Sequence, residues 1–174
     1  MPFDEAAGSR KAYDYSHNRA DGVLDGGATF VAGKQGNCMQ FDGTGKVEVE
    51  QSVLNFALPF SICSYVQVLE NKNIISILLN YNGLNRYYEY KVGLVAGMWY
   101  NLVVTYGSGT ICIYINGTLI ERGVVSSEWG NPIGVSINNA IYGTELGEGM
   151  LDEVKLYQQA LTQEEVQELV DDTK

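Results

Sequence analysis

Short runs of hydrophobic residues, separated by turn-forming residues, recur along nearly the whole chain. In several runs apolar and polar positions alternate, which is the period of a strand with one buried face. Many short strands with turn signals between them are typical of an antiparallel sandwich. The pattern therefore predicts an all-β protein of two packed sheets, built from the runs FVAGK, NCMQFDG, KVEVEQ, FSICSYVQVL, NIISILLNY, RYYEYKVGLV, MWYNLVVTY, TICIYIN, TLIERGVV, PIGVSINN and MLDEVKLY.

The clearest local prediction is a hairpin. Isoleucines at every second position of Thr110–Ile115 indicate one strand, and Thr118–Arg122 indicates the next. Asn116-Gly117 lies between them, and both residues tolerate the positive φ angles of a tight hairpin turn. Together with Thr118 they also form a glycosylation sequon, but the turn interpretation is favoured.

The C-terminal residues depart from the strand pattern. Thr162 and Glu165 have the spacing of a capping box, and Leu161 and Val166 have the spacing of a hydrophobic staple. Val166 and Leu169 begin a short apolar stripe of helical period. We therefore expect a single short C-terminal helix that lies against the sandwich.

Length and charge narrow the class of protein. The chain has 174 residues and shows no internal repeat, linker or low-complexity tract, so residues 1–174 are expected to form a single domain. A net charge of −10 opposes binding to nucleic acid, whose phosphates need a basic surface. No apolar run approaches the ~20 residues of a membrane span, so no membrane insertion is expected.

The cysteines Cys38, Cys63 and Cys112 each lie in an apolar run. An odd number cannot all pair within one chain, and a reduced thiol behaves as a small hydrophobic side chain. We interpret all of them as free core thiols, which predicts folding in a reducing compartment such as a cytoplasm. The polar N-terminus has no apolar signal segment. A mature domain cut from a precursor fits these features, and so does a protein made and kept inside a cell, such as one that is incorporated into a phage particle.

Several segments resemble, in order along the chain, the motifs of laminin-G-like jelly-roll modules of the concanavalin A-like lectin and glucanase family. They lie at residues 12–22 (AYDYSHNRADG), 26–37 (GGATFVAGKQGN), 41–43 (FDG), 60–66 (FSICSYV), 99–106 (WYNLVVTY), 114–117 (YING), 150–157 (MLDEVKLY) and 160–162 (ALT). His17 and Arg19 depart from the family pattern, because they replace glycines of the opening motif. Residues 68–98 match no family motif, although this region supplies much of the face on which relatives often bind sugars.

The resemblance implies a two-sheet antiparallel jelly-roll sandwich with one short C-terminal helix and a lectin-like role. It also implies a structural Ca²⁺ near the sandwich edge, held by carboxylate and carbonyl oxygens. Asp152 is the first candidate ligand, and Asp42 and Asp4 are weaker ones. Two structural alternatives stay open: an Asx-type turn for Asp42, and a carboxylate that accepts backbone hydrogen bonds for Asp152.

The residue patterns of a catalytic site are missing. Glucanases of this fold place two carboxylates on one strand, and the nearest string here, Glu48-x-Glu50, is more typical of a solvated strand face. The single histidine, His17, lies in a polar loop, which leaves a Ser/His/Asp triad or a clustered Cys/His zinc site without support. The protein is therefore expected not to be an enzyme.

A tyrosine-rich string at residues 86–91 is the most unusual in the chain. On a strand, Arg86, Tyr88 and Tyr90 share one face. Aromatic rings beside charged groups suit a sugar, whose C–H face stacks on the ring while its hydroxyls find polar partners. These residues are thus the candidate ligand-binding set. The alternative is that the tyrosines are good strand formers with half-buried rings.

Three functional classes follow. The first is a carbohydrate- or surface-binding module that serves adhesion, displayed in many copies on a phage or cell-surface assembly, with a glycan or a protein surface as partner. The second is a structural or decoration protein of a virion or other particle, with no small ligand. The third and most remote is a glycoside hydrolase. The free thiols favour a particle protein and the tyrosine-rich strand favours binding, so the first two classes are partly compatible.

Overall fold

The computed structural model describes residues 1–49, 59–70, 72–81, 84–124, 136–137 and 148–171, with the backbone alone for residues 72–81, 84–90 and 136–137. These residues form the strands β1 (Lys11–Ala12), β2 (Gly22–Asp25), β3 (Thr29–Ala32), β4 (Asn37–Asp42), β5 (Lys46–Val49), β6 (Phe60–Val68), β7 (Lys72–Tyr81), β8 (Leu84–Leu94), β9 (Trp99–Gly107), β10 (Thr110–Ile115), β11 (Thr118–Val124), β12 (Ser136–Ile137) and β13 (Glu148–Tyr157), and the helix α1 (Gln163–Asp171).

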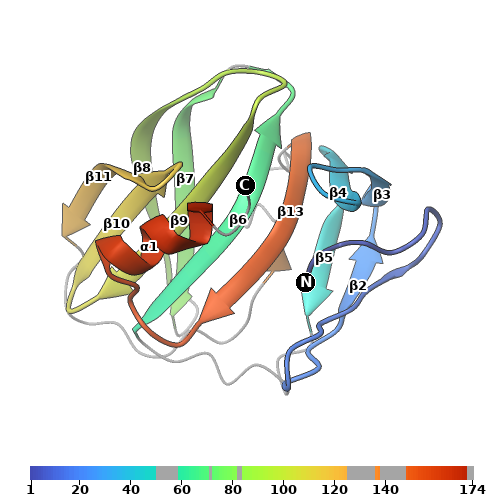
Figure 1. The fold of residues 1–174 in the computed structure, drawn as a ribbon, viewed down its shortest axis with the longest axis horizontal. Coiled ribbons are helices and arrows are strands. Elements are labelled where there is room, and N and C mark those ends of the chain that lie inside the picture. The colour runs from blue at the N-terminus through green and yellow to red at the C-terminus, as the bar shows by residue number, and fades with distance from the viewer. Residues whose placement is uncertain (50–58, 71, 82–83, 125–135, 138–147, 172–174) are drawn as a thin grey trace.

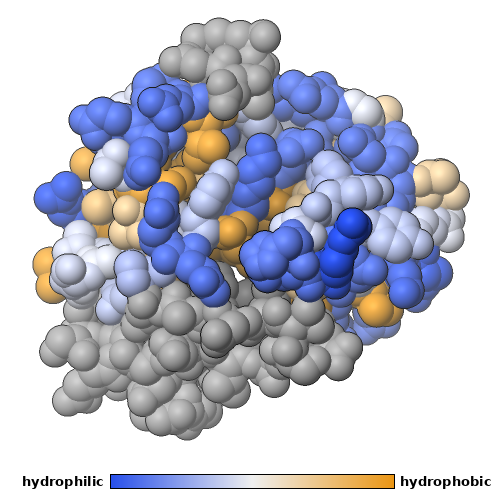
Figure 2. Space-filling model, turned by 60° about the horizontal axis from the view of Figure 1, so that its bottom comes forward, coloured by the Kyte–Doolittle hydropathy of each residue, from blue (hydrophilic) through white to orange (hydrophobic). Residues whose placement is uncertain are grey.

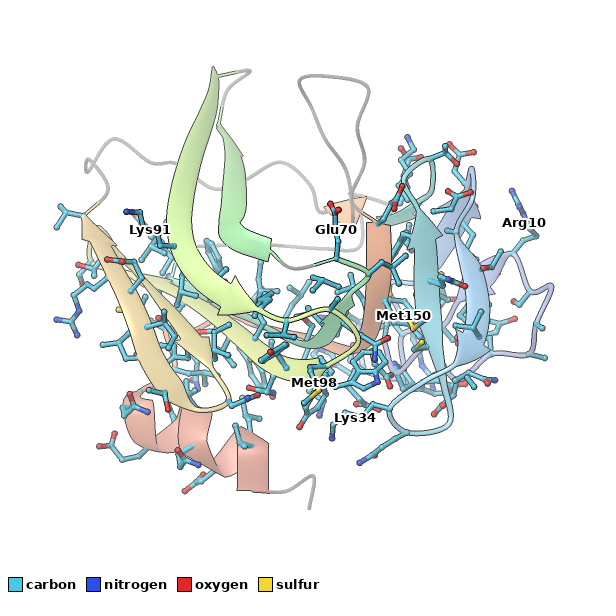
Figure 3. The ribbon with its side chains drawn as sticks, turned by 90° about the horizontal axis from the view of Figure 1, so that it is seen from above. Arg10, Lys34, Glu70, Lys91, Met98 and Met150 are labelled. Atoms are coloured by element: carbon cyan, nitrogen blue, oxygen red, sulfur yellow. The ribbon has the colours of Figure 1, made fainter. Side chains whose placement is uncertain are left out.

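The strands build two layers (Figure 1). A large sheet has the order β11-β10-β9-β6-β13-β4-β3, a four-stranded sheet has the order β1-β2-β5-β12, and β7 pairs with β8. In Figure 3 the curved β7–β8 pair stands over one face of the large sheet, and α1 lies on the opposite face. The described strand pairs are all antiparallel, as the sequence pattern predicts for a sandwich.

Among the described residues, two hydrophobic clusters lie between the layers. In the first, side chains of the four-stranded sheet such as Leu24 and Val47 pack against Phe30, Phe41 and others from the large sheet. In the second, Val92 and Leu94 of β8 pack against β6 and β9. Burial along β5 alternates, as expected for a strand that has one face in a core.

The helix α1 covers a further cluster on the outer face of the large sheet, which includes Cys63, Val103 and Val166. Its start is the predicted capping box: the Thr162 N–H donates to Glu165 at 2.8 Å, and the Glu165 N–H donates to Thr162 at 3.2 Å. The prediction of one C-terminal helix on the sandwich is therefore confirmed.

Two other local predictions are also confirmed. β10 and β11 form the predicted hairpin, and its turn residues Asn116 and Gly117 have φ angles of 50° and 78°. Cys38, Cys63 and Cys112 are buried and free. Within the described residues, no helix has the length and apolar character needed to cross a bilayer.

Candidate functional site

A pocket of about 440 Å³ opens between the N-terminal loop and one edge of β13. We call it the β13 pocket. Its walls come from Met1 and Pro2, from the loop between β1 and β2, from Val49 at the end of β5, and from residues 153–157 of β13. Figure 2 brings the lower side of Figure 1 forward, and there hydrophilic residues surround hydrophobic atoms at the middle of the face.

The loop wall is organised by one carboxylate. Asp14 accepts hydrogen bonds from the Ser16 N–H at 2.9 Å, the Ser16 hydroxyl at 2.7 Å and the Ala20 N–H at 2.9 Å. Burial alone would raise the pKa of Asp14, but these hydrogen bonds outweigh it and hold the pKa below its ordinary value. The family-like AYDYS opening is thus a self-bonded loop, and it forms even though His17 and Arg19 replace glycines, with Arg19 at a φ of 50°.

The strand wall is a bulge in β13. β6 pairs with β13 from Gly149 to Tyr157, with a register shift between Asp152 and Lys155, whereas β4 pairs with it only as far as Leu151. Beyond that point the start of the chain covers the second edge of β13 at Val154. The Met1 amine donates to the Val154 carbonyl at 2.8 Å, and the Val154 N–H donates to the Met1 carbonyl at 3.0 Å. Bulges commonly re-aim a strand in this way beside binding sites.

The lining combines an aromatic plane with hydrogen-bonding groups. Tyr15 is 64% exposed at the pocket, whereas Tyr13, two residues earlier, is 43% exposed and does not line it. Glu153 and Lys155 form an ion pair at 3.5 Å on the strand side. Rings and polar groups side by side can stack on a sugar face while bonding its hydroxyls.

A sequence model of the concanavalin A-like lectin/glucanase superfamily matches residues 64–167, which is more than half of the chain. The chain belongs to this superfamily. The resemblance found in the sequence motifs is thereby confirmed. Comparison with curated protein sequences gave no match.

Several solved structures share this concanavalin A-like fold. Domain 4 of the extracellular arabinanase AbnA from Geobacillus stearothermophilus, in complex with arabinotriose, has a TM-score of 0.65 at 17% identity, over 95% of this chain and 100% of that domain. The binding domain of Paraclostridial Mosquitocidal Protein 1 has a TM-score of 0.70 at 16% identity, over 92% of this chain and 49% of its own. The binding domain of botulinum neurotoxin DC, in complex with rat synaptotagmin II, has a TM-score of 0.66 at 14% identity, over 93% of this chain and 49% of its own.

The concanavalin A-like chain therefore spans about half the length of the two toxin domains and the whole of the arabinanase domain. Identities this low show a common fold and carry no site from one protein to another.

Two of the predicted metal ligands meet at the β3–β4 turn of the concanavalin A-like domain. The Asp152 carboxylate accepts from the Gln35 N–H at 3.3 Å and from the Glu153 N–H at 2.9 Å. Asp4 accepts from the Asn37 N–H at 3.0 Å on the same turn. Both carboxylates thus fix the turn, which also places the Lys34 ammonium 4.1 Å from the centroid of the Tyr65 ring.

Asp42 lies at the other end of β4, away from this turn. It accepts from the Thr44 N–H at 2.9 Å and from the Thr44 hydroxyl at 2.7 Å, and these bonds lower its pKa. This is the Asx-type turn that the sequence left as an alternative. It requires Gly27, because a Cβ there would lie 1.9 Å from an Asp42 carboxylate oxygen.

The described residues bring no third acidic side chain into a metal-holding group with these carboxylates. Among them, no group of at least three histidine, cysteine, aspartate or glutamate side chains is placed to hold a metal ion. The oxygens of Asp152 face backbone N–H groups, which favours its structural alternative. Calcium stays a prediction from the family resemblance, and no step of the proposed function depends on it.

The predicted ligand-binding residues Arg86, Tyr88 and Tyr90 belong to β8. The ladder sets their backbones opposite Leu79, Ile77 and Ile75 of β7, respectively. Their side chains lie outside the described part of the structure, so the tyrosine-rich binding face stays a prediction.

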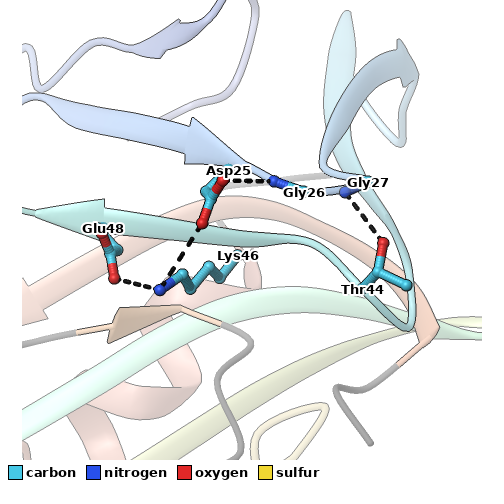
Figure 4. Close-up of polar contacts among 6 residues, drawn as sticks. All are labelled: Asp25, Gly26, Gly27, Thr44, Lys46 and Glu48. Atoms are coloured by element: carbon cyan, nitrogen blue, oxygen red, sulfur yellow. Dashed lines mark hydrogen bonds and ion pairs between the residues drawn. The ribbon is translucent and has the colours of Figure 1, made fainter. Parts of the chain in front are cut away.

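Glu48, the described member of the Glu48-x-Glu50 string, belongs to a surface ion network (Figure 4). The Lys46 ammonium bonds to the Glu48 carboxylate and lies 3.8 Å from an Asp25 oxygen. The Glu48 side chain is 58% exposed. An exposed, ion-paired carboxylate matches the solvated strand face expected from the sequence.

Sequence reasoning missed the β13 pocket. It noted that residues 12–22 and 150–157 both match family motifs, but it gave them no common role. The available signal was that two motif-like segments, one near each end of the chain, carry tyrosines beside polar residues. No local sequence pattern shows that these segments are neighbours. The contact that joins the two ends of the chain is between Met1 and Val154, which are 153 positions apart.

Proposed function

We propose that this concanavalin A-like domain is a non-catalytic glycan-binding module and that the β13 pocket is its binding site. The observation that carries the proposal is the exposed Tyr15, which lines a pocket of about 440 Å³ whose other walls offer polar groups. Pockets of this size suit small ligands, and the ring supplies the stacking plane that a sugar needs.

The electrostatics of the pocket support binding rather than hydrolysis. A glycosidase needs one carboxylic acid with a raised pKa and a second, available carboxylate. Here Asp14 has a lowered pKa and is occupied by its own loop, and Glu153 is paired with Lys155. Asp14 is therefore not poised to give a proton to a leaving group.

The comparisons support the same class of function by analogy. One structure of this fold is a domain of an arabinanase in complex with arabinotriose, and others are binding domains of toxins, one of them in complex with a synaptotagmin. A sugar or a protein surface is thus a partner known for this fold, and fold analogy alone cannot choose between them. The β13 pocket favours a sugar.

We further propose that the module acts in many copies, on a phage particle or another surface assembly. One exposed tyrosine with a few hydrogen bonds gives a weak site, and useful adhesion then needs several sites that act together. Buried free thiols are consistent with synthesis in a reducing compartment before such an assembly forms.

A glycan array followed by calorimetry with the best oligosaccharide tests the proposal. Tyr15→Ala should weaken binding about fivefold, the equivalent of about 1 kcal/mol of aromatic contact. Tyr13→Ala is the matched control, since it removes an exposed ring of the same loop that does not line the pocket. Equal losses for both variants, or the absence of any glycan ligand, would contradict the proposal; tight symmetric self-assembly without a ligand would assign the chain to the structural class instead.

A further inference from the structure

The backbone of β13 itself offers hydrogen-bonding groups to the pocket. In an antiparallel strand, successive residues direct their N–H and C=O groups to opposite edges. Val154 directs both groups away from β6, because both bond to Met1. Leu156, two residues further on, must therefore direct its N–H and C=O to that same edge, into the pocket that it lines.

These two groups of Leu156 have no partner among the described residues. β4 stops at Leu151, and the bonds from Met1 end at Val154. Backbone groups at a half-buried position normally find a partner in protein or in a ligand. Because β13 ends at Tyr157, Leu156 offers one donor and one acceptor side by side rather than the series that an added peptide strand would need.

One donor beside one acceptor matches two adjacent hydroxyl groups on a sugar ring. One hydroxyl oxygen accepts from the Leu156 N–H, and its neighbour donates to the Leu156 carbonyl, since a hydroxyl can play either role. A ring held in this way stays within the pocket that Tyr15 also lines. Aromatic stacking and a backbone pair together would fix both the plane and the rotation of the sugar.

The charges around the pocket decide between neutral and acidic sugars. Asp14 and Glu153 bring two carboxylates to the pocket. The described lining also holds two cationic groups, and both are already engaged: Lys155 pairs with Glu153, and the Met1 ammonium, whose pKa is lowered by burial, donates to the Val154 carbonyl. The chain as a whole carries a net charge of −10. The negative charge of the protein would repel an acidic sugar such as a uronic or sialic acid.

We infer that the β13 pocket selects neutral sugars with a free pair of adjacent hydroxyls, bound by the main chain of Leu156. This inference rests on the proposed glycan-binding function. It adds the class of ligand and the main-chain contact that recognises it. It also explains why no polar side chain in the sequence marks the contact, because its donor and acceptor belong to the backbone.

Amide hydrogen exchange of the unmodified protein tests the contact directly. Without sugar, the Leu156 amide should exchange fast while the Tyr157 amide, which points to β6, stays protected. The probes are arabinotriose, cellotriose and mannotriose as neutral sugars and trigalacturonate as the acidic one. The best neutral probe should protect the Leu156 amide at least about tenfold, and trigalacturonate should bind more weakly. A Leu156 amide that is already protected, or that a bound sugar leaves unchanged, overturns the inference.

A pair of variants supports the same test. Leu156→Pro removes the N–H at an outward edge position, where proline is tolerated, and should weaken the neutral probe about tenfold. Leu156→Ala keeps the N–H and should bind within about twofold of the original protein. Mono-O-methylation of either adjacent hydroxyl should reproduce the loss. If a neutral sugar binds through Tyr15 but none of these changes matters, the inference fails and the glycan-binding function stands; if no sugar binds, both fail.

Discussion

Asp152 shows how burial and hydrogen bonding compete at a single residue. Its side chain has no exposed surface, and burial raises its pKa, although the N–H groups of Gln35 and Glu153 offset part of the shift. The folded protein therefore holds this proton more tightly than the unfolded chain does. The resulting stability is fully present below the ordinary carboxyl pKa of about 3.9 and is lost as the pH rises through the higher folded pKa.

Replacing Asp152 by asparagine should remove this part of the pH dependence, because an amide does not ionise. We expect Asp152→Asn to lower the free energy of unfolding by about 1–3 kcal/mol at acidic pH, since the asparagine amide fits the turn N–H groups less well. The difference from the original protein should shrink as the pH rises. Urea unfolding between pH 4 and 7 measures it, and Asp25→Asn, at a carboxylate beside Lys46, is the control.

If the calcium hypothesis derived from the family resemblance holds, the folded protein with bound calcium favours the charged form of Asp152 rather than the protonated form. A bound metal favours the charged carboxylate and stabilises the folded state by mass action, about 2.7 kcal/mol at a hundred times its Kd. Melting in millimolar calcium and in chelator would then differ for the original protein and coincide for Asp152→Asn. Such a difference would make Asp152 a metal ligand, whereas coincident curves for both proteins leave it as the acceptor that fixes the β3–β4 turn.

At the scale of elements, local chemistry decided which predictions were reliable. The hairpin around Asn116-Gly117 and the helix cap at Thr162 could be predicted because each signal lies within a few residues of what it controls. For the same reason, the role of Asp42 could be limited to two alternatives, a calcium ligand or an Asx-type turn. The pairing of Met1 with Val154 could not, since main-chain bonds between distant residues leave no pattern in side-chain types.

The β7–β8 pair includes the strand for which the sequence predicts a sugar-binding face, and that prediction remains to be tested. If β8 presents a sugar-binding face, Tyr88→Ala and Tyr90→Ala should each weaken glycan or cell-surface binding about fivefold, with little change in melting temperature. Tyr87→Ala, on the alternate face of the strand, should leave binding unchanged. A loss of several kcal/mol of stability in the first two variants would place their rings in the core and remove this strand from consideration as a binding face.

At the scale of the whole molecule, the thiols report on the integrity of the sandwich. Burial raises the pKa of Cys38 to about 11 and that of Cys63 to about 12, so almost no reactive thiolate exists at these two residues at neutral pH. A thiol reagent should find little to react with in the native protein and three groups per chain, Cys38, Cys63 and Cys112, after denaturation. A rapid reaction without denaturant, or fewer thiols after it, would contradict the buried, reduced assignment.

The place of β13 in the large sheet has a consequence for biosynthesis. β13 is the last strand in sequence, yet it lies between β6 and β4, which are made much earlier. Until β13 leaves the ribosome, the sheet has a gap with two facing strand edges, and such edges readily pair with other chains. Closure of the gap by so distant a segment also makes for slow folding. Translation that stops short of residue 148 would therefore yield an aggregation-prone product rather than a smaller working domain.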